Sequence, residues 1–127
     1  MTTNRRNIWV YIASPYTKGD PGINTRFQLW MWEKLLDLGF TPIAPLWSHF
    51  QHVATPRPYA DWTQYDDELI SRCDVCLRLS AIEPSLNYVQ HESPGADHEV
   101  EVFRSQLKPV FFSVEDLAQW ADKVQTQ

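Results

Sequence analysis

The chain has 127 residues, enough for one hydrophobic core, so we expect a single domain over 1–127. Its net charge of −5 and the lack of a basic run argue against a nucleic-acid polymer as partner, though one small phosphorylated ligand stays open. No apolar run approaches the roughly 18 residues of a membrane span, and the N-terminal apolar stretch is too short for a signal peptide. We therefore expect a cytoplasmic protein without a membrane partner.

The first half of the chain predicts a strand, a helix and a second strand. The β-rich run 7–13 predicts the first strand. Apolar residues at steps of three and four predict an amphipathic helix over 23–38, with Gly39 as its C-cap. A short strand over 40–45 leads into 45–60, where three prolines predict a loop.

The second half continues the alternation of helices and strands. We expect a helix over 61–72 with Asp61 as N-cap, and a final helix that opens with the capping box of Ser113 and Asp116. The other predicted elements are a strand over 74–80, a loop over 81–92, a helix from 93, a strand over 108–112 and the final helix over 113–124. This order predicts an α/β fold, a Rossmann-like or flavodoxin-like parallel sheet of four to five strands with helices on both faces.

Cys73 and Cys76 form a C-x-x-C sequence. A redox pair of this type opens a helix just after a strand, whereas here a helix end runs into a strand. We interpret the spacing as accidental.

In open α/β sheets the ligand crevice lies beyond the carboxyl ends of the strands. Three polar segments are expected there: 11–19, 45–60 and 81–95. Four sequence features in this frame, "YIASPYT", Asp66 eight positions before Asp74, "SPGADHE" and "KPVFF", resemble the nucleoside 2-deoxyribosyltransferase-like superfamily over residues 7–112. That superfamily includes enzymes that exchange bases on deoxyribose and enzymes that hydrolyse nucleoside 5′-monophosphates.

The resemblance implies roles for individual residues. Glu99 is expected to be the nucleophile that attacks the anomeric carbon, Asp66 to protonate or orient the leaving base, and Tyr11 to position the Glu99 carboxylate. At the position of Ser93, the monophosphate hydrolases carry a phosphate-binding serine and the transferases an aspartate. The resemblance thus favours an N-glycosidase acting on nucleoside monophosphates, without a cofactor, as a homodimer or larger homo-oligomer.

Elementary chemistry is consistent with these roles but leaves alternatives open. One carboxylate can capture an oxocarbenium-like centre while a second acid protonates the departing base. Ser93 as N-cap, with Pro94 at the first helical position, would leave the N–H groups of Gly95 and Ala96 free for an anion. Ser93 could equally cap only its own helix, and Glu99 or Asp66 could be ordinary helix acids.

Further residues are expected to contact the substrate. We place Ser14 and Thr17 with Ser93 and Gly95 among the substrate- or phosphate-binding residues, and His49 and Trp47 against the base. The base could stack on Trp47, Phe50 or Trp62. His49 and His52 are three residues apart but lack a third ligand nearby, so we expect no metal. The identity of the base and sugar, base transfer in place of hydrolysis, and a non-catalytic nucleotide-binding module all remain open.

Overall fold

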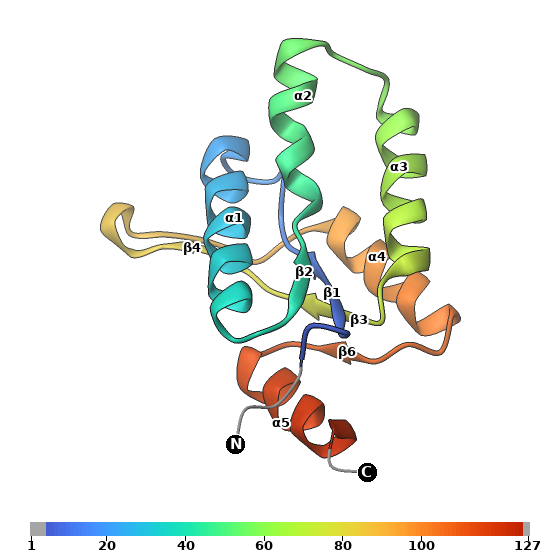
Figure 1. The fold of residues 1–127 in the computed structure, drawn as a ribbon. Helices are drawn as coiled ribbons and strands as arrows, with labels where there is room; N and C mark the ends of the chain where they lie inside the picture. The colour runs from blue at the N-terminus through green and yellow to red at the C-terminus, as the bar shows by residue number, and fades with distance from the viewer. Residues whose placement is uncertain (1–4, 126–127) are drawn as a thin grey trace.

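The computed structural model describes residues 5–125. Its main sheet has four parallel strands in the spatial order β2-β1-β3-β6 (Figure 1). The strands are β1 (Trp9–Ala13), β2 (Thr41–Ile43), β3 (Val75–Arg78) and β6 (Val110–Phe111). This is the strand order of flavodoxin-like folds, in which the switch point lies between the first and third strands. The predicted fold class is confirmed.

Helices cover both faces of the sheet, and β1 shows how the sequence distributes them. Successive side chains of a strand point to opposite faces. Val10 and Ile12 are buried against α1 (Pro21–Asp37) and α5 (Val114–Gln125). Tyr11 and Ala13 are buried on the other face, against α3 (Tyr59–Arg72) and α4 (Pro94–Ser105). Any residue that follows the register of Tyr11 is therefore directed toward α3 and α4.

The ends of the helices agree with several predicted caps. Gly39 follows α1 with a φ of 92°, and the N–H groups of Gly39 and Phe40 donate to the carbonyls of Leu36 and Leu35. These two bonds form a Schellman motif, whose positive φ only glycine adopts without strain. The side chain of Ser93 caps α4, and that of Ser113 accepts a bond from the N–H of Asp116 at the start of α5.

The predicted loop over 45–60 is wrong in its first half. A 3₁₀ turn, η1 (Pro45–Trp47), runs directly into a short helix, α2 (Ser48–Ala54). The prolines of this stretch flank the helix and do not interrupt it, and Pro45 stands at the first position of η1, where a missing N–H costs nothing. The next helix, α3, also starts earlier than predicted, with Pro58 as N-cap, so Asp61 lies in its first turn and is not the cap.

The predicted loop over 81–92 is also wrong, because most of it forms a β-hairpin. Strands β4 (Ala81–Glu83) and β5 (Tyr88–Gln90) pair antiparallel and are joined by a 3₁₀ turn, η2 (Pro84–Leu86). Asn87 closes the turn in the left-handed conformation, which asparagine tolerates. The hairpin extends past α1, at the edge of the molecule (Figure 1).

Two sequence features have plain structural outcomes. Cys73 ends α3 and Cys76 lies within β3; both are buried and free, so the pair does not open a helix as redox pairs do. Burial raises the pKa of the Cys73 thiol to about 12. Within residues 5–125, every helix is too short or too polar to cross a membrane.

Candidate active site

A cavity of about 740 Å³ opens at the carboxyl ends of β1 and β2. Its floor is the segment that follows β1, and its walls are η1 with α2 on one side and α3 with the first turns of α4 on the other. This is the edge where open α/β sheets bind their ligands. The volume lies within the usual range for small-molecule sites, roughly 300 to 1,000 Å³.

Glu99 and Tyr11 meet at the base of this cavity. Glu99 lies in the second turn of α4 and borders the cavity, while the fully buried Tyr11 lies behind it in β1. The Tyr11 hydroxyl donates a hydrogen bond to the Glu99 carboxylate. One turn later in α4, Phe103 packs against the Tyr11 ring, with ring centroids 5.6 Å apart. The expected pairing of the two side chains is therefore present, and the tyrosine is held by core packing.

The environment of Glu99 shifts its protonation. Burial raises the pKa of its carboxyl to about 8, the hydrogen bond from Tyr11 acts in the opposite direction, and the charges of Asp66 and Asp67 raise it again. Burial and the neighbouring carboxylate raise the pKa of Tyr11 as well, so its hydroxyl keeps its proton and acts as a donor. Such a carboxyl changes charge near neutral pH, as acid–base and nucleophilic groups of enzymes do.

Asp66 faces the same space from α3. Burial, followed by the charge of its neighbour Asp67, raises the pKa of Asp66 to about 7. Its Oδ1 atom is buried and has no hydrogen-bond partner among the described residues. Buried polar atoms are normally satisfied, so an unpartnered oxygen beside a cavity is completed by water or by a ligand atom. Asp67, by contrast, is exposed, as expected for adjacent residues of which only one can turn inward.

The N-terminus of α4 forms one end of the cavity. Ser93 is buried, and its Oγ accepts a hydrogen bond of 3.0 Å from the N–H of Ala96. Of the two N–H groups predicted to be free, that of Ala96 is therefore occupied, and that of Gly95 is left to face a ligand. A Cβ added at Gly95 would meet no atom within 4 Å, so the space above this residue is open. Thr17 and Lys18 border the same end.

Two buried polar residues of α1, Asn24 and Gln28, hold the segments around the cavity. The Gln28 side chain donates to Ser14 Oγ (2.8 Å) and to the Ile12 carbonyl (3.1 Å), and accepts from the Leu46 N–H (2.8 Å). Asn24 donates to two carbonyls of the segment after β1 and accepts from the Tyr88 hydroxyl. The sequence analysis missed both, although polar residues four apart on the apolar face of a predicted helix were the available signal.

Aromatic and imidazole side chains line the far part of the cavity. His49 of α2 is hydrogen-bonded through Nδ1 to the Tyr16 hydroxyl at 2.6 Å. His52, one turn later, accepts a bond of 2.9 Å from Trp62 Nε1 of α3. Flat walls of this kind suit a planar ligand. Among residues 5–125, no group of three or more histidine, cysteine or acidic side chains could hold a metal ion.

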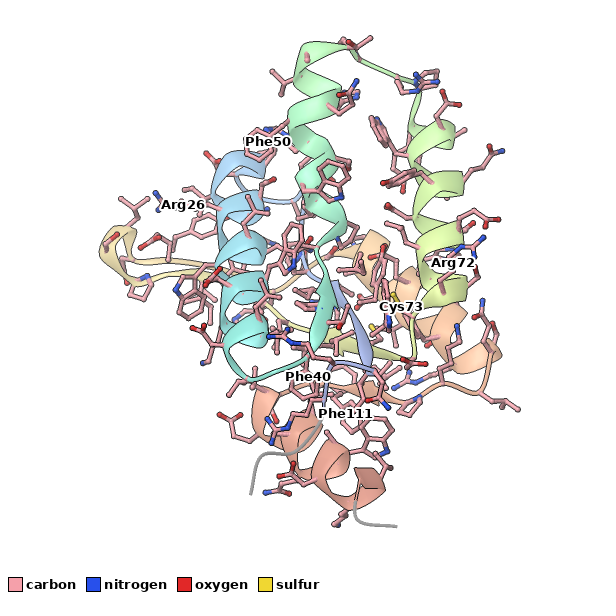
Figure 2. The ribbon with its side chains drawn as sticks, viewed as in Figure 1. Arg26, Phe40, Phe50, Arg72, Cys73 and Phe111 are labelled. Carbon is pink, nitrogen blue, oxygen red and sulfur yellow. The ribbon has the colours of Figure 1, made fainter. Side chains whose placement is uncertain are left out.

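The structure brings together most of the predicted site residues, but not Trp47. Ser14, Thr17, His49, Asp66, Ser93, Gly95 and Glu99 all border the cavity, and Tyr11 touches it through Glu99. Trp47 ends η1, is 45% exposed and does not border the cavity. Figure 2 likewise shows Phe50 on the side of α2 turned away from α3. Of the three aromatic residues considered for stacking on the base, only Trp62 borders the cavity.

The arrangement combines a desolvated carboxyl held by a tyrosine, a second carboxyl with an unpartnered oxygen, and a helix N-terminus, all on one cavity. It can attack an electrophilic carbon, exchange a proton and bind an anion. Comparisons of the chain with protein-family models, with curated proteins and with solved structures gave no match.

Proposed function

We propose that the protein cleaves the N-glycosidic bond of a nucleoside 5′-monophosphate and releases the free base and the sugar 5-phosphate. The observation that carries this proposal is the juxtaposition of Glu99, bonded to Tyr11, with Asp66, whose buried oxygen has no partner, on one cavity. The pKa of Glu99 is the higher of the two, so a pair that holds one proton carries it mainly on Glu99. The reaction uses the less populated form, with Glu99 ionised and Asp66 protonated, and the hydrogen bond from Tyr11 favours that form.

In the first step the ionised Glu99 attacks the anomeric carbon of the sugar. The C–N bond breaks, its electron pair leaves with the base, and Asp66 gives its proton to a base nitrogen. The hydrogen bond from Tyr11 favours the ionised form of Glu99, and the positive charge that develops on the sugar favours it further. The product of this step is a glycosyl ester of Glu99, as in retaining glycosidases.

In the second step water attacks the anomeric carbon of the ester. The proton of the water passes to the Asp66 carboxylate, and Glu99 leaves as a carboxylate, so the enzyme returns to its starting state. No redox change occurs and no cofactor is needed. If a free base replaced water in this step, the same site would exchange bases.

The N-terminus of α4 supports a phosphate at the 5′ position. One end of the cavity is formed by the start of α4, the helix that carries Glu99. The free N–H of Gly95 and the hydroxyl of Ser93 lie there, at the positive end of the helix dipole. Lys18 adds a positive charge at the same end, 3.7 Å from Glu92. Serine at position 93 adds no charge that would repel the phosphate.

We also propose a cytoplasmic homodimer or larger homo-oligomer. The outer side of η1 and α2 supports an assembly, because Trp47 of η1 is 45% exposed and Phe50 and Val53 of α2 are 59% and 66% exposed. Apolar side chains gathered on one surface commonly mark an interface between subunits. Light scattering of the purified protein measures the state directly.

The function is tested by base release from a panel of ribo- and deoxyribonucleoside 5′-monophosphates and the matching nucleosides, with and without free base. We expect release from at least one monophosphate, and loss of at least about 10³-fold of that activity in Glu99→Gln. The control is Glu101→Gln, since Glu101 lies on the same helix but is exposed and paired with Arg104. If the protein only exchanges bases between a nucleoside and a free base, its function is base transfer and not hydrolysis. If Glu99→Gln keeps full activity, Glu99 is not the nucleophile.

A further inference from the structure

The cavity continues well beyond the two carboxyls. On α3 its lining runs from Asp66 back to Tyr59, a separation of seven residues, which is about 10 Å of helix axis at 1.5 Å per residue. In a purine, the exocyclic nitrogen lies only about 5 Å from the nitrogen that carries the sugar, given ring bonds of about 1.3 to 1.5 Å. An ordinary base placed beside Asp66 therefore leaves the far end of the cavity unfilled.

Hydrogen-bond donors gather at that far end. Nδ1 of His52 accepts from Trp62 Nε1 and, at 3.2 Å, from the backbone N–H of Arg57, so the hydrogen of the ring lies on Nε2. The side-chain Nε of Arg57 donates to Asp61 at 3.3 Å. Both terminal amino groups of this guanidinium have no partner among residues 5–125. His52 and Arg57 both border the cavity.

We propose that the substrate is a nucleoside monophosphate whose base is enlarged at its exocyclic amine by a substituent ending in a carboxylate, which Arg57 and His52 bind. The inference rests on the proposed function, which places the sugar at Glu99 and hence directs the base toward α2 and α3. A carboxylate matches the donors, because the two terminal amines of a guanidinium bind its two oxygens side by side. Asp61 bonds to Nε on another edge of the guanidinium and so orients it.

The walls between the two ends suit such a substituent. Trp62 contacts His52 edge to face, with ring centroids 6.1 Å apart, and both rings border the cavity, where they offer apolar surface to a short carbon chain. Thr63 lines the same stretch, and its hydroxyl is bonded to the Tyr59 carbonyl, so its methyl group is the part left for contact. The cavity thus has a charged end for the phosphate, an apolar middle and a donor-rich far end.

The test compares AMP and CMP with derivatives that carry a 3-carboxypropyl group on N6 or N4, and with the corresponding amides, which keep the shape and remove the charge. Binding is measured by calorimetry on the Glu99→Gln protein, so that no ligand is consumed. We expect one of the two carboxylates to bind about tenfold more tightly than its amide, the effect of a charge-assisted pair of hydrogen bonds. Adding Arg57→Gln is expected to reduce that preference to about twofold or less.

Arg72→Gln is the matched control. Arg72 is also exposed and also paired with an acid four positions away, but it lies at the opposite end of α3 (Figure 2). Carboxylates that bind no more tightly than the amides, or a preference that survives Arg57→Gln, would overturn the inference. Base release by the wild-type protein is measured separately. If AMP or CMP releases its base but the carboxylate binds no more tightly than its amide, the far subsite is overturned and the N-glycosidase is not. Arg57-dependent binding with no release from any ligand upholds the subsite and overturns the N-glycosidase.

Discussion

Replacing Glu99 by glutamine should stabilise the protein, and increasingly so as the pH rises. In the unfolded chain this carboxyl ionises with an ordinary pKa of 4.5, whereas burial raises its pKa in the folded protein to about 8. Between these two values the unfolded chain has lost the proton that the folded protein still holds. The wild-type protein therefore loses stability as the pH rises from about 4.5 to about 8.

The size of the effect follows from the same two pKa values. At 1.36 kcal/mol per pKa unit, the full difference corresponds to about 5 kcal/mol above pH 8. Glu99 is only half-buried and borders a cavity that admits water, so we expect about 2 to 4 kcal/mol. Glutamine has nearly the same shape, can still accept the bond from Tyr11, and does not ionise.

The assay is urea denaturation of the wild-type protein and Glu99→Gln at pH 5, 6, 7 and 8. The difference in free energy of unfolding between the two proteins should be below about 1 kcal/mol at pH 5 and should widen at each step. Glu101→Gln should show no such trend, because Glu101 is exposed. A difference that stays constant from pH 5 to 8 would refute the account of a desolvated carboxyl at position 99.

Three further substitutions test the site. Tyr11→Phe removes the hydrogen bond that favours ionised Glu99, so its pKa rises further; base release at pH 7 should fall about 10- to 100-fold and recover partly at higher pH. Base release by the wild-type protein should be greatest between about pH 7 and 8, where one carboxyl of the pair is ionised and the other protonated. Asp66→Asn should remove the decline of activity at alkaline pH and lower kcat about 10²-fold or more. An unchanged pH profile in Asp66→Asn would contradict the role of Asp66. Gly95→Ala should keep the melting temperature, because its Cβ meets only open space, but raise KM for monophosphates about tenfold and not for nucleosides; equal effects on both would place the phosphate elsewhere.

The fold could be predicted because its signals are local and periodic. The β-rich run 9–13 is buried on both faces from Val10 to Ala13, as a central strand is. The three- and four-residue steps of 23–38 mark one face of a helix. The prolines of 45–60 predict a loop, but they flank the helix over 48–54 and lie outside it. The hairpin over 81–90 was missed for a similar reason, since Pro84 lies in its turn.

The site could be predicted only in part, for a related physical reason. The resemblance points to Glu99 and Asp66, and Asp66 and Asp67 are adjacent in a helix, so only one of them can turn inward. Trp47 was assigned to a loop, where no period tells which side chains turn inward. Once 48–54 is a helix, His49 and His52 share one face and Phe50 lies on another. Gln28 and Asn24 interrupt the apolar face of the predicted helix, which is a signal for buried polar residues, but the distant groups that they bind leave no pattern in the sequence.

The two walls of the cavity differ in how firmly they are attached. Glu99 and Tyr11 belong to elements that share a buried core, and Gln28 ties the segments after β1 and β2 to α1. The opposite wall, α2, contains no buried residue, and a helix of seven residues has little stability of its own. In a subunit whose α2 is not covered by a partner, the amide hydrogens of α2 should therefore exchange with solvent faster than those of α4. If α2 moves while Tyr11 and Glu99 stay fixed, the same active-site geometry can accept ligands of different thickness.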